Sequence, residues 1–271
     1  MKFSVLMSVY DKEHPAYLES ALKSLLAQTL LPDEILIVKD GPLNSALDTV
    51  IAKYEHAYPI LSVISLPENV GLGAALNYGL LHAKHDLVAR MDSDDICYPT
   101  RFEQQVAFLK DHPSVSIVGA AIQEFNQAPE DLRRFRRLPS DPDQIIQFAR
   151  YRNPMNHPTV MFRKMDVLAA GSYEDMPLFE DWHLWVRMIQ KGYRLYNLER
   201  PLLHFRVGND MIGRRHGFSY LKKELNFLVD LKHKKFLSTS AFLVCALAKL
   251  PLRLLPKPLL SSLYKSVLRK R

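Results

Sequence analysis

The sequence has very few cysteines and no recognisable targeting segment. Its 271 residues include only Cys97, beside an acidic cluster, and Cys245, in an apolar stretch. Two thiols cannot form the disulfide framework of a small secreted protein. The N-terminus lacks the long apolar core and the small-residue cleavage site of a signal peptide. These absences favour a reducing compartment, and we expect a cytoplasmic protein.

Long hydrophobic runs are also missing. The longest uncharged stretch of the tail, residues 236–248, is shorter than the ~20 residues that a transmembrane helix needs. Pro251, Pro256 and Pro258 are expected to interrupt the segment that follows. The sequence has no internal repeat, low-complexity tract or Gly/Ser linker, and its composition is that of an ordinary globular protein. We therefore expect a segment that lies in the bilayer interface and does not cross it.

The net charge of +7 is distributed unevenly along the chain. Residues 214–271 contain 14 Lys and Arg but only two acidic residues, so this tail carries about +12 and residues 1–213 about −5. This separation argues against a nucleic-acid-binding protein. Because the tail carries Leu, Phe and Tyr among its basic residues, it is typical of a surface that binds anionic lipid headgroups. A solvated helical face is the alternative.

Strand-like and helix-like patterns alternate over the first 120 residues. Apolar runs that close on polar or turn residues predict strands at residues 3–10, 34–40, 60–66, 87–92 and 115–125, and helical spacing predicts helices at 17–29, 47–54, 73–83 and 99–110. Strands separated by helices form a mostly parallel twisted sheet flanked by helices, which is an α/β fold. Ligands of such sheets bind at the carboxyl ends of the strands.

The pattern is less regular after residue 125. Residues 126–143 are basic and loop-like, so a surface segment is expected there. A strand at 159–164, an amphipathic helix at 182–192 and a pair of strands around 194–207 are predicted to complete the body. Helical periodicity is strong again at 217–235.

The segment MDSDD, residues 91–95, places three carboxylates at the end of a predicted strand. Carboxylates this close repel one another unless a cation or hydrogen-bond donors neutralise them. Mg²⁺ or Mn²⁺ takes oxygen ligands from one or two carboxylates and completes its shell with phosphate oxygens. The cluster therefore predicts a metal site for a nucleotide diphosphate. An acidic turn that caps the helix after Pro99 is the alternative.

A second acidic pair, Glu180 and Asp181 in FEDW, opens the predicted helix at 182–192. A carboxylate within hydrogen-bond reach of a reacting hydroxyl can serve as a base that removes its proton. Asp181 is the candidate base. The alternative is that both residues only complement the helix dipole.

Four blocks of the sequence resemble glycosyltransferase family 2, the inverting transferases with a GT-A fold. They are SVLMSVYDKEHPAYLESALKSLLAQTLLPDEILIVKDGP, ENVGLGAALNYGL, ARMDSDDICYPTRFEQQVAFL and FEDWHLWVRMIQKGY, in the family's order over residues 3–195. The sequence is most similar to members that build bacterial exopolysaccharide of the amylovoran type, capsule or O-antigen. We therefore expect a GT-A domain at 1–213, and the charge and helical periodicity of the tail predict a helical, membrane-associating extension at 214–271.

The resemblance also implies roles for individual residues. Asp94 would be the main ligand of Mn²⁺ or Mg²⁺, with Asp92 facing the metal or the ribose, and Asp181 would be the base. The donor would contact Tyr10, Asp11, Asp40, Asn69, Gly71, Asn77, Asp92, Asp95 and Arg206. Asp40 would accept a hydrogen bond from a uracil ring if the donor is a UDP-sugar, although Asp-Gly is also a common turn pair. Glu180, Trp182 and His157 would lie on the acceptor side.

The sequence departs from the family pattern in two places. It lacks the Gln-x-x-Arg-Trp motif of processive synthases, which implies transfer of a single sugar. Gly208 occupies the position where many relatives carry a histidine that can reach the metal, so His204, His216 or no residue could be the third ligand. Arg206, Arg214 and Arg215 could clamp the diphosphate, because guanidinium groups suit phosphate oxygens.

We therefore expect an enzyme that transfers one sugar from a nucleotide-diphosphate donor, expected to be a UDP-sugar, to a saccharide acceptor. The acceptor is expected to be lipid-linked, at the inner face of the cell membrane. A nucleotidyltransferase would use a similar sheet and metal, but the first turn lacks a basic glycine-rich signature. A phosphatase with a catalytic aspartate usually carries its acidic motif after the first strand. A regulatory protein that binds sugar nucleotides without catalysis is the alternative from another class.

Overall fold

The computed structural model describes residues 1–207 and 216–254. Its strands are β1 (Phe3–Val9), β2 (Glu34–Lys39), β3 (Leu61–Ser65), β4 (Leu87–Met91), β5 (Ile96–Cys97), β6 (Val115–Phe125), β7 (Arg134–Arg136), β8 (Met161–Arg163) and β9 (Arg194–Arg206). Its helices are α1 (Pro15–Leu26), α2 (Ser45–Ala57), α3 (Leu72–His82), α4 (Arg101–Asp111), α5 (Pro142–Ala149), α6 (Lys164–Ala169), α7 (Glu180–Gln190), α8 (Phe218–His233) and α9 (Thr239–Leu254), with a 3₁₀ turn at His157–Thr159.

The described strands form one sheet in the order β3-β2-β1-β4-β8-β6-β9-β5, with β7 paired to β6. The pairs β3-β2, β2-β1 and β1-β4 are parallel, whereas β8 is antiparallel to both β4 and β6. β6 and β9 form a long parallel pair. The expected α/β fold with a mostly parallel first half is confirmed, and the carboxyl ends of β1, β2 and β4 lie at the same edge.

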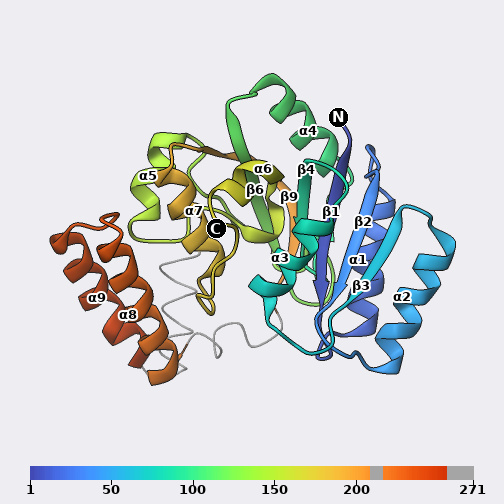
Figure 1. The fold of residues 1–271 in the computed structure, drawn as a ribbon, viewed down its shortest axis with the longest axis horizontal. Coiled ribbons are helices and arrows are strands. Elements are labelled where there is room, and N and C mark those ends of the chain that lie inside the picture. The colour runs from blue at the N-terminus through green and yellow to red at the C-terminus, as the bar shows by residue number, and fades with distance from the viewer. Residues whose placement is uncertain (208–215, 255–271) are drawn as a thin grey trace.

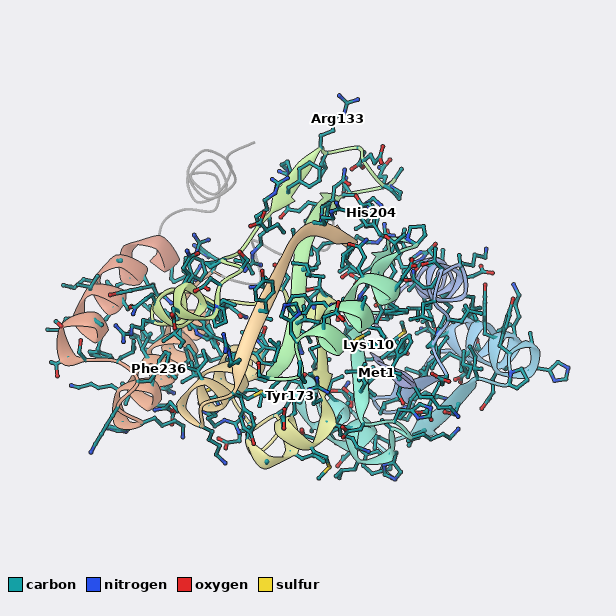
Figure 2. The ribbon with its side chains drawn as sticks, turned by 90° about the horizontal axis from the view of Figure 1, so that it is seen from above. Met1, Lys110, Arg133, Tyr173, His204 and Phe236 are labelled. Atoms are coloured by element: carbon teal, nitrogen blue, oxygen red, sulfur yellow. The ribbon has the colours of Figure 1, made fainter. Side chains whose placement is uncertain are left out.

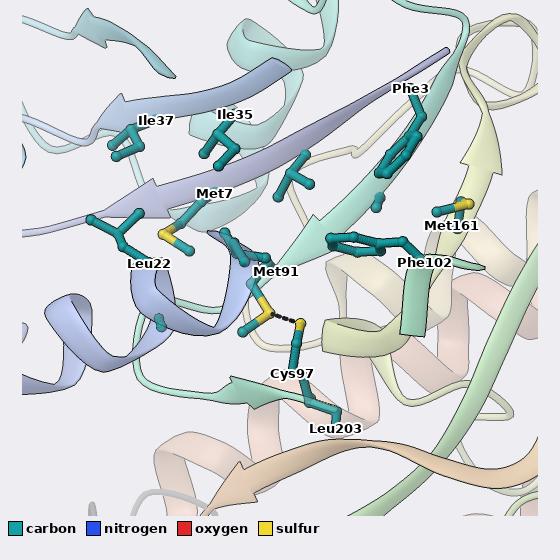
Figure 3. Close-up of a cluster of buried hydrophobic side chains, with 14 of the residues drawn as sticks. Phe3, Met7, Leu22, Ile35, Ile37, Met91, Cys97, Phe102, Met161 and Leu203 are labelled. Atoms are coloured by element: carbon teal, nitrogen blue, oxygen red, sulfur yellow. Dashed lines mark hydrogen bonds between the residues drawn. The ribbon is translucent and has the colours of Figure 1, made fainter. Parts of the chain in front are cut away.

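Helices cover both faces of the sheet, as Figure 1 shows. On one face α1, α2 and α4 bury a core that includes Phe3, Leu22 and Phe102, and Figure 3 shows part of it. On the other face α3, α6 and α7 bury a second core with Leu6 and Trp185. Successive residues of β1 enter opposite cores because side chains alternate along a strand.

The C-terminal helices α8 and α9 pack on α7, at the side of the molecule opposite α2 (Figure 1, Figure 2). The rings of Phe179 and Phe227 stack with centroids 4.9 Å apart, and Trp182 contacts Phe227 at 4.8 Å. Aromatic side chains contribute large buried areas to such contacts. The described part of the extension therefore shares a hydrophobic core with the turn that carries Asp181. The boundary expected at 213/214 lies outside the described residues.

Two of the basic residues expected to meet lipid are internal. Arg253 donates two hydrogen bonds to the buried carboxylate of Glu224, at 2.7 and 3.1 Å, and Lys249 lies 3.0 Å from the same carboxylate. Both cations therefore join α9 to α8 and are not available to anionic headgroups. The other expected cations, Lys257, Lys265, Arg269, Lys270 and Arg271, lie outside the described residues, as do Pro256 and Pro258.

Three expectations about secondary structure were wrong. Residues 194–206 form a single strand with register shifts against β6 and not a strand pair, because β6 offers one long partner. The segment 126–143 contains β7, which adds to β6 and whose Arg134 pairs with Glu124. α9 continues past position 251 to Leu254, so the first tail proline does not end it. None of the helices that the structure describes has the length and hydropathy needed to cross a membrane.

Candidate active site

The acidic cluster lies between β4 and β5, at the carboxyl edge of the parallel strands. One ligand oxygen from each of Asp92, Asp94 and Asp95 lies within 4.8 Å of the others. Asp95 is fully buried, and its Oδ2 has no hydrogen-bond partner among the described residues. Burial, reinforced by Asp92 and Glu13, raises the pKa of Asp94 to about 7, and burial and Asp94 raise the pKa of Asp95 well above its usual value. The positive charge around the cluster is thus not sufficient to keep all three carboxylates ionised at neutral pH.

Arg206, at the end of β9, fixes the loop that carries the cluster. Its backbone N–H donates to Oδ1 of Asp95 at 2.8 Å, and its Nε donates to the carbonyl of Asp94 at 2.9 Å. The guanidinium carbon lies 3.7 Å from the ring centroid of Tyr17 and 4.3 Å from that of Phe125. Arg206, predicted to contact the donor, is therefore placed beside the cluster and held there from several sides.

The second acidic pair lies at the first turn of α7. Asp181 Oδ2 accepts a hydrogen bond from Asn153 Nδ2 at 2.6 Å, and its Oδ1 accepts one from the Trp182 N–H at 2.7 Å. Burial raises the pKa of Asp181, and burial together with Asp181 raises the pKa of Glu180 to about 7. Both carboxylates are half-buried, so this turn offers two proton acceptors whose pKa values are raised above those of ordinary carboxyl groups.

The first turns of α3 and α7 lie against each other. A Cβ atom placed on Gly73 would lie 3.5 Å from Cβ of Glu180 and 3.6 Å from Cβ of Tyr173. Both helices therefore direct their positive N-terminal ends toward the same region.

Asp40 follows β2 and organises the loop that precedes α3. Its Oδ1 accepts from the Val70 N–H at 2.7 Å, and its Oδ2 accepts from Asn69 Nδ2 and the Gly71 N–H at 3.1 and 3.2 Å. Gly41 has a φ of +86°, and a Cβ there would lie 2.6 Å from the backbone nitrogen of Asn69. The structure thus brings Asp40, Asn69 and Gly71 together, with the Asp40 side chain buried.

Tyr10 and Asp11, at the end of β1, are exposed. The backbone carbonyl of Asp11 accepts a hydrogen bond from Asn44 Nδ2 at 2.9 Å. Their side chains stay accessible at the same edge of the sheet as Asp40.

Three residues predicted near the donor or acceptor have structural contacts. The Oδ1 of Asn77 accepts a hydrogen bond from the Tyr173 N–H at 2.9 Å. His157 is buried, with Nε2 2.9 Å from the Tyr173 hydroxyl, and burial followed by Arg90 lowers the pKa of His157 well below its usual value. Trp182 is 4% exposed and donates from Nε1 to the Ala149 carbonyl at 2.8 Å.

The histidines considered as third metal ligands do not join the ligand group of the acidic cluster. His204 lies near the carboxyl end of β9 (Figure 2) and stacks on Tyr98 with ring centroids 4.2 Å apart. Within residues 1–207 and 216–254, the group of potential ligand atoms contains neither His204 nor His216. Gly208, Arg214 and Arg215 lie outside the described residues.

Sequence reasoning missed several residues that the structure brings to the site. Arg90 is 2% exposed and forms an ion pair with Asp92, Asn153 donates a hydrogen bond to Asp181, and Tyr173 lies with Glu180 against Gly73. Glu13 accepts a hydrogen bond from Ser93 inside the acidic loop. The sequence offered one signal for these residues, namely that Arg90 is a charged residue within the otherwise apolar strand LVARM.

Comparison with known proteins identifies the family. The profile of Glycosyl transferase family 2 matches residues 4–221. The amylovoran biosynthesis glycosyltransferase AmsE of Erwinia amylovora is 42% identical, over 97% of this chain and 98% of that protein. The UDP-Gal:alpha-D-GlcNAc-diphosphoundecaprenol beta-1,3-galactosyltransferase of Escherichia coli is 35% identical, over 99% of this chain and 97% of the relative. The mannosyltransferase PcManGT from Pyrobaculum calidifontis, solved with GDP-Man and Mn²⁺, superposes with a TM-score of 0.65 at 16% identity and covers 98% of this chain and 75% of its own.

The chain belongs to glycosyl transferase family 2 and is a glycosyltransferase with a GT-A fold. The resemblance to transferases of bacterial cell-surface polysaccharide synthesis is confirmed. This assignment favours glycosyl transfer over the nucleotidyl transfer and phosphatase alternatives.

Proposed function

We propose that this enzyme transfers a single sugar from a nucleotide-diphosphate donor, with inversion at the anomeric carbon, to a lipid-linked saccharide. The observation that carries the proposal is the presence of two clusters of carboxylates at one edge of the sheet. Asp92, Asp94 and Asp95 form one group, and Glu180 and Asp181 form the other. The first group suits a metal–diphosphate and the second suits a base. A relative 35% identical to this chain is named for transfer from UDP-Gal to a diphosphoundecaprenol-linked sugar, which favours a UDP-sugar donor and a lipid-linked acceptor.

The acidic cluster fits a hard divalent cation such as Mn²⁺ or Mg²⁺. All of its ligand atoms are carboxylate oxygens, and the buried Oδ2 of Asp95 has no partner among the described residues. Asp94 and Asp92 would hold the ion directly, and Asp95 would support them. A bound ion would supply positive charge to the departing diphosphate.

The chain's own residues would prepare the other half of the reaction. Asp181 would accept the proton of the acceptor hydroxyl as that oxygen attacks the anomeric carbon. Asn153 and the Trp182 N–H hold its carboxylate in one orientation, which keeps the base aimed as the bond forms. Asp40, with the loop 69–71, would form the wall that receives the nucleobase.

A screen of nucleotide sugars with Mn²⁺ tests the proposal. We expect one UDP-sugar to raise the melting temperature and to release UDP when a matching lipid-linked acceptor is added, because ligands that bind only the folded state stabilise it. Thermal shift and nucleotide release would be scored for each donor with Mn²⁺ and with excess chelator. If no UDP-sugar or GDP-sugar produces either signal, the donor class is wrong.

We also propose that the enzyme is peripheral at the inner face of the cell membrane and docks through α9. The side chains of Leu243, Val244, Leu247 and Leu250 are 43–71% exposed and follow helical spacing along one face. Lys222, Lys223 and Lys235 are exposed on and beside α8. The two C-terminal helices thus expose apolar side chains and cations, the two kinds of group that a helix in a bilayer interface uses.

Replacing Val244 and Leu247 with Glu should lower co-sedimentation of the full-length protein with anionic liposomes several-fold. The substitution places two charges on the face that would enter the headgroup region. Added salt should weaken wild-type binding, because part of the attraction is electrostatic. Co-sedimentation at low and high salt measures both effects.

Leu81→Glu is the matched control, since Leu81 is 66% exposed on α3 while Leu247 is 71% exposed on α9. We expect this control to bind liposomes like the wild type. Substitution is preferable to truncation after residue 235, which would remove α9 and uncover Phe227 and Trp182. Equal co-sedimentation of all three proteins would contradict docking through α9.

A further inference from the structure

Arg90 is a buried charge in the middle of the sheet. It lies on β4 opposite Leu6 of β1, its side chain is 2% exposed, and its backbone N–H donates to the Val160 carbonyl at 2.9 Å. Its neighbour Val88 belongs to the core under α3 and α7, and alternation along the strand directs Arg90 to the same side. A guanidinium stays charged at every physiological pH, so burying one is costly unless anionic groups surround it.

A single ion pair does not account for this charge. Nη2 of Arg90 contacts Oδ1 of Asp92, while Nε and Nη1 are buried with no hydrogen-bond partner among the described residues. A guanidinium has five N–H donors, and the three on Nε and Nη1 of Arg90 have no acceptor among the described residues. The guanidinium of Arg90 therefore also interacts electrostatically with groups to which it is not hydrogen-bonded.

The groups whose charge acts on Arg90 belong to both halves of the site. Asp92 and Asp95 come from the acidic loop, and Tyr173 comes from the loop before α7. Tyr173 and Glu180 both lie against Gly73 of α3, which places Tyr173 beside the first turn of α7, on the face of the sheet toward which Arg90 is directed. The charge of Arg90 acts on both Glu180 and Asp181.

We propose that Arg90 is a positioning residue that couples the two halves of the site: it orients Asp92 for the metal and supplies the buried positive charge that Glu180 and Asp181 share. This inference rests on the proposed function. By holding one oxygen of Asp92, Arg90 fixes the plane of that carboxylate before an ion arrives, as residues that support metal ligands do. It also favours the ionised form of the acidic pair that burial disfavours.

Other groups act on the same acidic pair. Arg136 of β7 favours the carboxylate of Asp181, as do the hydrogen bonds from Asn153 and the Trp182 N–H, while the charge of Asp181 disfavours the ionised form of Glu180. Tyr173 is neutral, because burial raises its pKa. Among these groups, Arg90 is the one that also contacts the acidic cluster.

The test separates the charge of Arg90 from its forked shape. Arg90→Met removes both, and we expect the acidic limb of the kcat/KM profile to move to higher pH by about one unit, because the base loses a cation. Mn²⁺ affinity, measured by calorimetry without turnover, should fall about tenfold. Arg90→Lys keeps the charge but not the fork, so its acidic limb should stay in place while Mn²⁺ affinity falls.

Arg163→Met is the matched control, because Arg163 is a half-buried arginine that donates to the backbone carbonyls of Val115 and Leu109. It should change neither the pH profile nor the Mn²⁺ affinity, and its melting temperature is measured so that any loss of stability is known. An unchanged profile and unchanged Mn²⁺ affinity in Arg90→Met overturn the inference, as does an equal effect of Arg163→Met. If Arg90→Met does not fold, Arg90→Lys decides, since unchanged Mn²⁺ affinity there overturns the orienting role.

The outcomes also distinguish this inference from the proposed function. If the wild type binds Mn²⁺ but transfers no sugar from any donor, the proposed function fails while the calorimetric comparison still reports on Arg90. If the wild type transfers sugar and the Arg90 variants match it in both measurements, only the inference fails.

Discussion

Asp181→Asn is expected to lower kcat by about 10²–10⁴-fold while the Kd for UDP stays within about twofold of the wild type. The side chain would accept a proton only as the new bond forms, so its loss affects the transition state far more than the bound donor. Because burial raises the pKa of Asp181, wild-type kcat should also fall as the pH drops through that raised value. Steady-state kinetics with a lipid-linked acceptor, together with calorimetry for UDP, measures both quantities.

Glu180→Gln is the control on the same turn. It removes the neighbouring carboxylate, whose pKa burial and Asp181 raise to about 7, and we expect a smaller loss of kcat. Melting temperatures are needed for both variants, because an amide at position 181 has one acceptor oxygen, whereas the carboxylate uses one oxygen for Asn153 and the other for the Trp182 N–H. If Glu180→Gln abolishes turnover and Asp181→Asn does not, Glu180 is the base. A wild type that binds UDP but turns over no donor would be a sugar-nucleotide-binding protein.

Periodicity was sufficient to predict the first half of the fold. Strands such as Phe3–Val9 and Glu34–Lys39 are buried on both faces, so their apolar runs were unambiguous, and helices between them required parallel pairing. The positions of Asp92–Asp95 and of Glu180 and Asp181 followed from where those elements end. The order of the second half did not follow, because β8, β6 and β9 pair in ways that depend on contacts distant in sequence.

Partners distant in sequence also explain what was missed in the site and the tail. Lys249 and Arg253 were predicted to face lipid, but both pair with Glu224, which lies on another helix. A helical pattern shows that a face is apolar but not which neighbour covers it. Arg90 was visible only as a charge within a strand, and its significance required the positions of Asp92 and Tyr173.

Asp94→Ala should nearly abolish Mn²⁺-dependent binding of UDP, raising its Kd by about 10²-fold, because the cluster loses its main oxygen ligand. The same substitution should stabilise the metal-free protein at pH 8. In the folded state the pKa of Asp94 is about 7 against an ordinary 3.8, so the folded protein retains a proton that the unfolded chain releases. Stability of the metal-free wild type should therefore fall as the pH rises from about 4 to about 7, and the alanine variant should lack this part of the dependence.

Thermal unfolding from pH 5 to pH 8, with Mn²⁺ and with chelator, tests the metal site without requiring turnover. Mn²⁺ should stabilise the wild type more at pH 8 than at pH 5, because ligand carboxylates must be deprotonated to bind a metal. Asp111→Ala removes an exposed carboxylate at the end of α4 and should leave the response to Mn²⁺ unchanged. Equal UDP affinity with Mn²⁺ and with chelator in the wild type would mean that the cluster holds no catalytic ion. Protonation of Asp94 would then relieve the repulsion between the carboxylates. UDP affinity should in that case fall as the pH rises above 7, which is the opposite of the dependence that a metal site produces.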